Sequence, residues 1–170
     1  MNSKSKIKNI MRGFTLIEAI IYSALLALFL FSSILFASNI LGANTRVTER
    51  NELLVNQEFL EKKLNYIVGQ SNEITLPNVG DSGSVLTLTG ANSDLFPATF
   101  SLSNNQVMLD LPGEANDASL TSNRVKITEF SVAHVSDQTS VPSIRVAFSL
   151  SSVNLPAITL TTNFSYATTQ

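Results

Sequence analysis

Residues 12–41, RGFTLIEAIIYSALLALFLFSSILFASNIL, form the stretch around which the rest of the chain is organised. Glu18 is the only charged residue between residues 14 and 41, whereas the preceding residues hold four basic side chains and no acidic one: Lys4, Lys6, Lys8 and Arg12. As a helix rising ~1.5 Å per residue, residues 14–41 would be about 42 Å long, and a bilayer core needs about 20 residues. The stretch therefore predicts a single-pass transmembrane helix with its basic flank in the cytoplasm.

Two common membrane signals explain this stretch incompletely. A cleavable secretory signal has a basic start, but its apolar region is usually about 7–15 residues and a small-residue cleavage site follows it. A plain signal anchor accounts for the length and the basic flank but not for Glu18. A carboxylate costs roughly 2.5–3.5 kcal/mol at the centre of a membrane helix on insertion scales, and less near an end. We therefore expect Glu18 to have a specific functional role.

The arrangement of Gly13, Phe14 and Glu18 after a basic flank resembles the type IV prepilin signal. Type IV pilins share this signal with the pseudopilins of secretion and DNA-uptake systems. The resemblance covers about the first 30 residues, and beyond them only the order of a long helix and then strands is similar. It implies that prepilin peptidase cleaves after Gly13 and methylates the new amino group of Phe14, and that Glu18 is the assembly carboxylate. The other residues of the signal motif are Arg12, Thr15, Leu16 and Ile17.

The residue types suit these implied tasks. Gly13 has no Cβ, so the backbone can enter a peptidase active site closely. Glu18 lies one helical turn from the N-terminus that cleavage would create. In family members this carboxylate is thought to meet the N-terminal ammonium of a neighbouring subunit, and in a low dielectric both charges gain from pairing. Small residues recur through residues 19–38, either as ordinary membrane-helix residues or as sites where helices pack closely in a filament core.

Residues 42–69 are expected to form the amphipathic second half of the same helix. Gly42 is the point where we expect the helix to bend or locally melt, and Gly69 suits its C-terminal cap. One apolar stripe is predicted from Val47, Leu53 or Leu54, Leu60, Leu64 and Ile67. Charged residues are predicted to fill the other, solvated faces or to form inter-subunit salt bridges: Arg46, Glu49, Arg50, Glu52, Glu58, Glu61, Lys62 and Lys63. Glu58 and Lys62 have the favoured order for an i,i+4 ion pair.

Residues 70–170 are predicted to form a β-rich globular head. Strands are expected at residues 73–76, 85–89, 125–135, 144–150 and 158–166, and a hairpin is expected around Asn104 and Asn105. Residues 77–83 and 111–123 read as loops. The predicted fold class is α+β and pilin-like, with the long helix packed against a C-terminal antiparallel sheet. The chain has no cysteine, so a disulfide or thiolate metal site is excluded.

Charge and side-chain inventory give little support to catalysis or ligand binding. The chain carries 11 basic and 13 acidic residues, and removal of residues 1–13 leaves seven basic ones and a net charge of −6, so nucleic acid is an improbable partner. The single histidine, His134, lies in a β-run and is expected to be a surface or hydrogen-bonded strand residue. Loop acids that could suggest calcium lack the spacing of an EF-hand loop: Asp81, Asp94, Asp110, Glu114 and Asp117. We expect no enzyme, no cofactor and no metal site.

The resemblance implies a structural subunit of a type IV pilus or pseudopilus, in a secretion or competence system. Its partners would be prepilin peptidase, other pilin or pseudopilin subunits and the inner-membrane assembly platform. The precursor would lie in the bacterial inner membrane and the assembled subunit in the periplasm or outside the cell. An alternative is a minor tip or adhesin-type pilin whose head binds a surface, a secreted protein or DNA. A third is an uncut, signal-anchored protein with an unrelated β domain, which would keep Met1.

Overall fold

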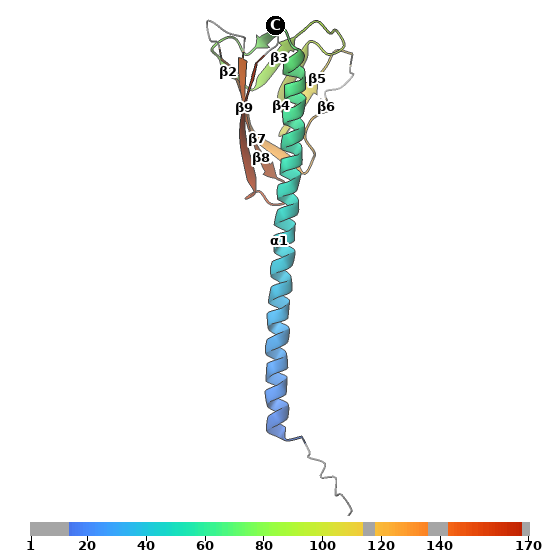
Figure 1. Ribbon diagram of the computed structural model, residues 1–170, viewed down its shortest axis with the longest axis vertical. Coiled ribbons are helices and arrows are strands. Elements are labelled where there is room, and N and C mark those ends of the chain that lie inside the picture. The colour runs from blue at the N-terminus through green and yellow to red at the C-terminus, as the bar shows by residue number, and fades with distance from the viewer. Residues whose placement is uncertain (1–13, 114–117, 136–142, 168–170) are drawn as a thin grey trace, which may run out of the picture. The chain divides into compact units, whose positions relative to one another are not determined.

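The computed structural model describes residues 14–113, 118–135 and 143–167, and these contain one long helix followed by nine strands (Figure 1). The chain divides into two compact units, Met1–Asn44 and Thr45–Gln170. The helix α1, Leu16–Gln70, contains 55 residues. All strands are antiparallel and follow the helix in the sequence. The predicted α+β class is therefore confirmed.

Helix α1 is one element across the position where we predicted a weak point. Gly42 lies within it, and the helix ends at Gln70, one residue after the expected cap at Gly69. In the first unit, every described side chain from residue 14 to residue 44 is exposed except Glu18, which is half-buried. That unit therefore buries none of its apolar side chains within the chain.

The strands of the second unit form two sheets rather than one. The five-stranded sheet has the order β1-β3-β4-β5-β6, with the bounds β1 Glu73–Leu76, β3 Val85–Thr89, β4 Ala98–Ser103, β5 Gln106–Asp110 and β6 Ala118–Ser119. The four-stranded sheet has the order β2-β7-β8-β9, with the bounds β2 Ser82–Gly83, β7 Val125–Val135, β8 Ser143–Ser152 and β9 Thr159–Ala167. Two short strands, β2 and β6, lie where the sequence predicted loops, and each adds a short edge to a sheet.

The predicted hairpin is present between β4 and β5. Asn104 and Asn105 connect the two strands with φ angles of 51° and 61°, and Ser103 pairs with Gln106 across the turn. Two successive residues with positive φ are typical of the tight hairpin turn that matches the twist of the strands. Asparagine tolerates this conformation better than most residues with a Cβ.

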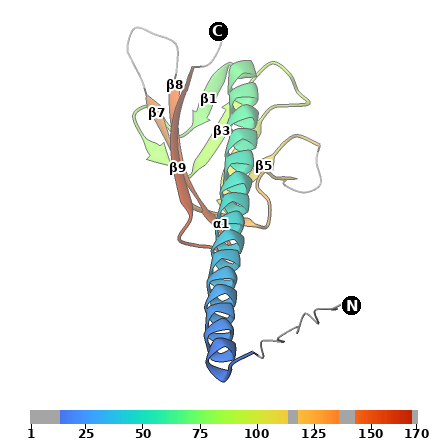
Figure 2. The same cartoon turned by 60° about the horizontal axis from the view of Figure 1, so that its bottom comes forward.

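A single hydrophobic core joins the second half of α1 to both sheets. Leu60, Leu64 and Ile67 of α1 are fully buried, together with large side chains from both sheets such as Phe100 and Phe148. Figures 1 and 2 show this part of α1 lying alongside the strands. These three members of the predicted apolar stripe are confirmed.

The open choice between Leu53 and Leu54 is resolved, and one member of the stripe is corrected. Leu53 is buried and its neighbour Leu54 is exposed. Val47 is 58% exposed, so its assignment to the stripe was wrong. The buried apolar residues of α1 begin at Leu53, nearly two turns after Val47, and the buried residue before it is Glu49.

Candidate functional site

Thr15 caps the N-terminus of α1. Its hydroxyl Oγ1 accepts a hydrogen bond from the backbone N–H of Glu18 at 3.3 Å, and its carbonyl accepts one from the N–H of Ala19 at 3.1 Å. A threonine followed three residues later by a glutamate is a known start signal for helices. The capping role of Thr15 was missed, although this spacing was available in the sequence.

Glu18 and Tyr22 contact each other on one face of α1. The Tyr22 hydroxyl donates a hydrogen bond to Oε1 of Glu18 at 3.3 Å, and the two residues are four apart in sequence. The ring of Phe14 packs against that of Tyr22 with centroids 5.6 Å apart. Tyr22, for which we predicted no role, therefore positions the carboxylate and also contacts the residue expected to become the N-terminus.

Within the residues described, Glu18 has no cationic partner. Its position in the first turn of α1 is favourable, because the positive end of the helix dipole lies there. Leu16 and Ile17 are exposed, and Phe14 is 67% exposed. The predicted sites Arg12 and Gly13 lie outside the described residues.

The first unit has the properties of a membrane anchor. Its apolar part has a mean hydropathy of 2.4, and none of that window is buried inside the protein. By length and composition α1 is able to cross a membrane. Three serine hydroxyls along it donate hydrogen bonds to helix carbonyls, Ser23 to Ile20 at 2.9 Å, Ser32 to Phe29 at 2.9 Å and Ser33 to Phe29 at 2.8 Å. These bonds lower the cost of placing hydroxyl groups in lipid.

A second polar site joins α1 to the residues at the end of β8 and in the turn that follows it. Glu49, only 4% exposed, accepts hydrogen bonds from the Ser152 hydroxyl at 2.7 Å and from Nδ2 of Asn154 at 2.9 Å. Arg124 lies 3.3 Å from the same carboxylate. Hydrogen bonds from Asn154 and Ser152, and the charge and hydrogen bond of Arg124, hold the pKa of Glu49 below its ordinary value of 4.5 against the opposing effect of burial.

Residues one and two turns further along α1 extend this site. The Ser122 hydroxyl donates to Oε1 of Glu52 at 3.0 Å, and the Ser122 N–H donates to Oδ1 of Asn56 at 2.8 Å. Arg124 also approaches Glu52 at 3.8 Å. We call these residues the Glu49 cluster: Glu49, Glu52, Asn56, Ser122, Arg124, Ser152 and Asn154.

The Glu49 cluster corrects the prediction that Glu49 belongs to a solvated helix face. Its carboxylate is buried because three polar side chains from the head surround it. By contrast, Glu58 and Lys62 form the predicted i,i+4 ion pair at 2.7 Å on an exposed face. The cluster holds the head on the helix through these hydrogen bonds and ion pairs, so we assign it a structural role.

The other candidate residues do not gather into a reactive site. His134 is a buried strand residue whose Nδ1 lies 3.0 Å from the Pro77 carbonyl oxygen, as a donor in the corresponding tautomer. The prediction of a hydrogen-bonded strand histidine is confirmed. Among the described residues, no three histidine or acidic side chains lie together as metal ligands would. Glu114 and Asp117 lie outside the described residues.

Comparison with known proteins adds no relative. Neither a family model, nor a curated protein, nor a solved structure matches the chain.

Proposed function

We propose that the chain is a prepilin-type structural subunit that is processed after Gly13 and assembled through its N-terminal helix into a pilus or pseudopilus. Glu18 is the observation that carries this proposal. It is the single charged residue of an otherwise apolar helix segment, it is half-buried, and it has no cationic partner in the described chain. A carboxylate in such a segment is costly unless another group compensates it.

Cleavage after Gly13 would supply the compensating group. The new ammonium of Phe14 would carry the only positive charge near this end of the mature helix, since the basic residues of 1–13 leave with the leader. Glu18 of one subunit would then pair with the ammonium of another in a low-dielectric environment. The Tyr22 hydroxyl, 3.3 Å from the carboxylate, would hold Glu18 in position for this contact.

The apolar surface of the first unit supports the same proposal. Its described side chains from Phe14 to Leu41 are exposed except for Glu18, so lipid must cover them before assembly and neighbouring helices could cover them afterwards. Small side chains along the segment would let such helices approach closely. A plain membrane anchor needs the same apolar surface but gives no task to Glu18.

Mass spectrometry of the N-terminal peptide from the native host is the direct test. We expect a mature chain that begins at Phe14 and is one methyl group heavier than the unmodified peptide. A chain that keeps Met1 in cells with an active prepilin peptidase would refute processing. It would instead support a signal-anchored protein.

Substitution of Glu18 tests assembly separately from processing. Glu18→Gln removes the charge with little change of shape, so we expect processing to continue and incorporation into filaments to be lost. Glu58→Gln is the matched control, because Glu58 is an exposed glutamate of the same helix whose ion pair lies on the surface. Normal incorporation of Glu18→Gln subunits would contradict the assembly role of the carboxylate.

A further inference from the structure

The outer edge of β9 is open. β9 is the last strand of its sheet and pairs only with β8 in the described part of the chain. Its sequence, TLTTNFSYA, contains no charged residue and no proline. Proteins usually protect edge strands with charges, proline, bulges or short length, because an open edge accepts another strand. At nine residues, β9 is a long and unprotected edge.

The inner face of β9 also remains partly uncovered. Residues along the strand alternate between exposed and half-buried, and none is fully buried. Phe164 packs on Phe148 with ring centroids 5.9 Å apart and on Tyr166 at 6.1 Å, yet Phe164 and Tyr166 are only half-buried. A further strand beside β9 would cover this apolar surface. The apolar side chains of β9 therefore pack against the core but are only partly covered by it.

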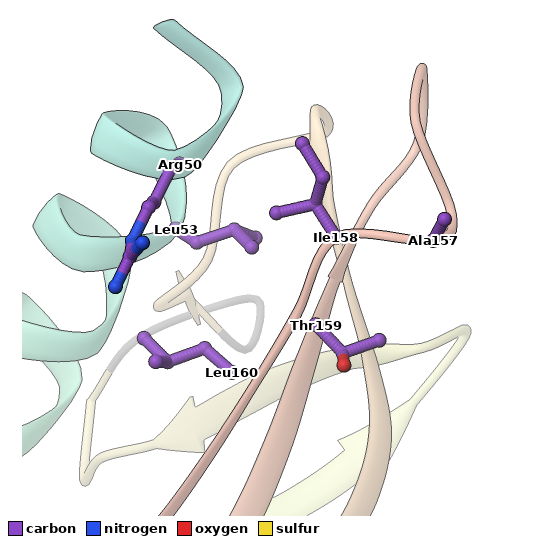
Figure 3. Close-up of a pocket in the computed structure, with 6 residues that line it drawn as sticks. All are labelled: Arg50, Leu53, Ala157, Ile158, Thr159 and Leu160. Atoms are coloured by element: carbon purple, nitrogen blue, oxygen red, sulfur yellow. The ribbon is translucent and has the colours of Figure 1, made fainter. Parts of the chain in front are cut away.

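A hollow of about 340 Å³ lies where β9 begins. Its walls come from α1 and from the start of the strand: Arg50, Leu53, Ala157, Ile158, Thr159 and Leu160. Figure 3 shows the side chains of Leu53 and Leu160 projecting into the space between the two elements. The hollow therefore combines an apolar lining with one guanidinium group.

Arg50 is free to bind an anion. It makes no ion pair or hydrogen bond with the residues described. The residues one helical turn away, Arg46 and Leu54, are not acidic. The neighbouring Glu49 carboxylate is already bound by Arg124 and two polar side chains. A carboxylate from outside the chain would be the natural partner for this guanidinium.

The direction of β9 fixes how a partner strand would reach Arg50. Leu160, near the start of β9, lines the hollow together with Leu53 of α1. Figures 1 and 2 show the end of β9 and the C-terminal end of α1 at the same end of the head, so the two elements run in the same direction. A segment antiparallel to β9 would therefore have its C-terminal end next to Arg50. Antiparallel addition is the geometry that β9 already adopts with β8.

We propose that β9 and the hollow at its start form a strand-addition site. Its occupant is an extended segment of another protein that runs antiparallel to β9 and presents a carboxylate to Arg50. Backbone hydrogen bonds along β9 would supply affinity with little dependence on sequence, and alternate apolar side chains would supply selectivity. The site is formed by residues of the second unit alone, so it does not depend on processing at Gly13.

A second copy of β9 is a poorer occupant. Antiparallel pairing of two β9 strands would point residues 45–70 of the two α1 helices in opposite directions. That arrangement is unsuited to chains anchored in the same membrane. A strand without charges also offers no group that would engage Arg50.

The test uses the full chain in detergent and a synthetic peptide with the sequence of residues 143–152, SIRVAFSLSS, which is the strand that β9 naturally pairs with. One peptide carries a free C-terminal carboxylate and the other a C-terminal amide. We expect saturable binding, with the free acid bound up to about fivefold more tightly, which is the upper end of the range for one exposed ion pair. Hydrogen exchange should slow in residues 159–167.

Matched variants separate the two parts of the site. Arg50→Gln should abolish the preference for the free acid, whereas Arg46→Gln, on the same helix but outside the hollow, should keep it. Asn163→Lys places a charge on the open edge and should weaken the binding of both peptides. Ser101→Lys places the same charge on β4, which is paired on both sides, and should leave binding unchanged.

Four results would overturn the proposal. Neither peptide binding saturably, or binding without protection of residues 159–167, would refute strand addition at β9. Equal binding of acid and amide would refute the role of Arg50. Self-association of the peptide-free chain that Asn163→Lys abolishes would assign the edge to a second copy.

Discussion

Leu60→Ala is expected to be strongly destabilising, because Leu60 is fully buried where α1 meets the two sheets. The substitution removes three carbon atoms from the core, and about 0.8 kcal/mol per buried CH₂ gives a transfer loss of about 2.4 kcal/mol. The cavity that remains raises the expected loss to about 2.7–5 kcal/mol. At about 4 °C per kcal/mol for a domain of this size, the melting temperature should fall by roughly 10–20 °C.

Thermal unfolding of the full chain in detergent, followed by circular dichroism of the β-strands, measures this loss. Val55→Ala is the matched control, since Val55 lies on the same helix but is 63% exposed. We expect its stability to stay within about 0.5 kcal/mol of the parent, because surface substitutions rarely do more. Equal effects of the two substitutions would show that the stripe of α1 is not held against the sheets as described.

Two further substitutions test the Glu49 cluster and the hairpin. The lowered pKa of Glu49 means that its ionised form stabilises the fold, so the contribution is present above the ordinary value of 4.5 and is lost as the pH falls through the folded-state pKa. Glu49→Gln should therefore destabilise the chain in denaturant titrations at pH 7 and less at pH 3, and a larger loss at pH 3 would contradict the burial of an ionised carboxylate. Asn104 has a φ of 51°, so Asn104→Val should cost about 1–2 kcal/mol in the same titrations, whereas Asn104→Gly should not; equal losses would exclude backbone strain as the cause.

Local patterns predicted the elements of this fold well. The stripe at Leu60, Leu64 and Ile67 followed from helical spacing alone, since residues three and four apart share a face. The hairpin at Asn104 and Asn105 followed from residue types that accept positive φ. These features depend on neighbours within a few residues, so local sequence patterns were enough to predict them.

Long-range features could not be predicted in the same way. Glu49 looked like a surface residue because its partners Arg124 and Asn154 are 75 and 105 residues away. The division of the strands into two sheets depends on which strands pair with each other. The alternation of residues within one strand does not specify its partner. At the candidate assembly site the sequence indicated Glu18 but not Tyr22, although the spacing of four residues could have suggested the contact.

The wide sequence separation within the Glu49 cluster has a consequence for synthesis of the chain. A ribosome adds roughly 5–20 residues per second, so the 105 residues between Glu49 and Asn154 take on the order of 5–20 s. During that interval the nascent helix carries a carboxylate whose set of partners is incomplete, because Arg124 is made first and Ser152 and Asn154 follow. The β8–β9 turn is therefore among the last parts of the head that can contact α1, because Ser152 and Asn154 can bind Glu49 only after residue 154 has been translated.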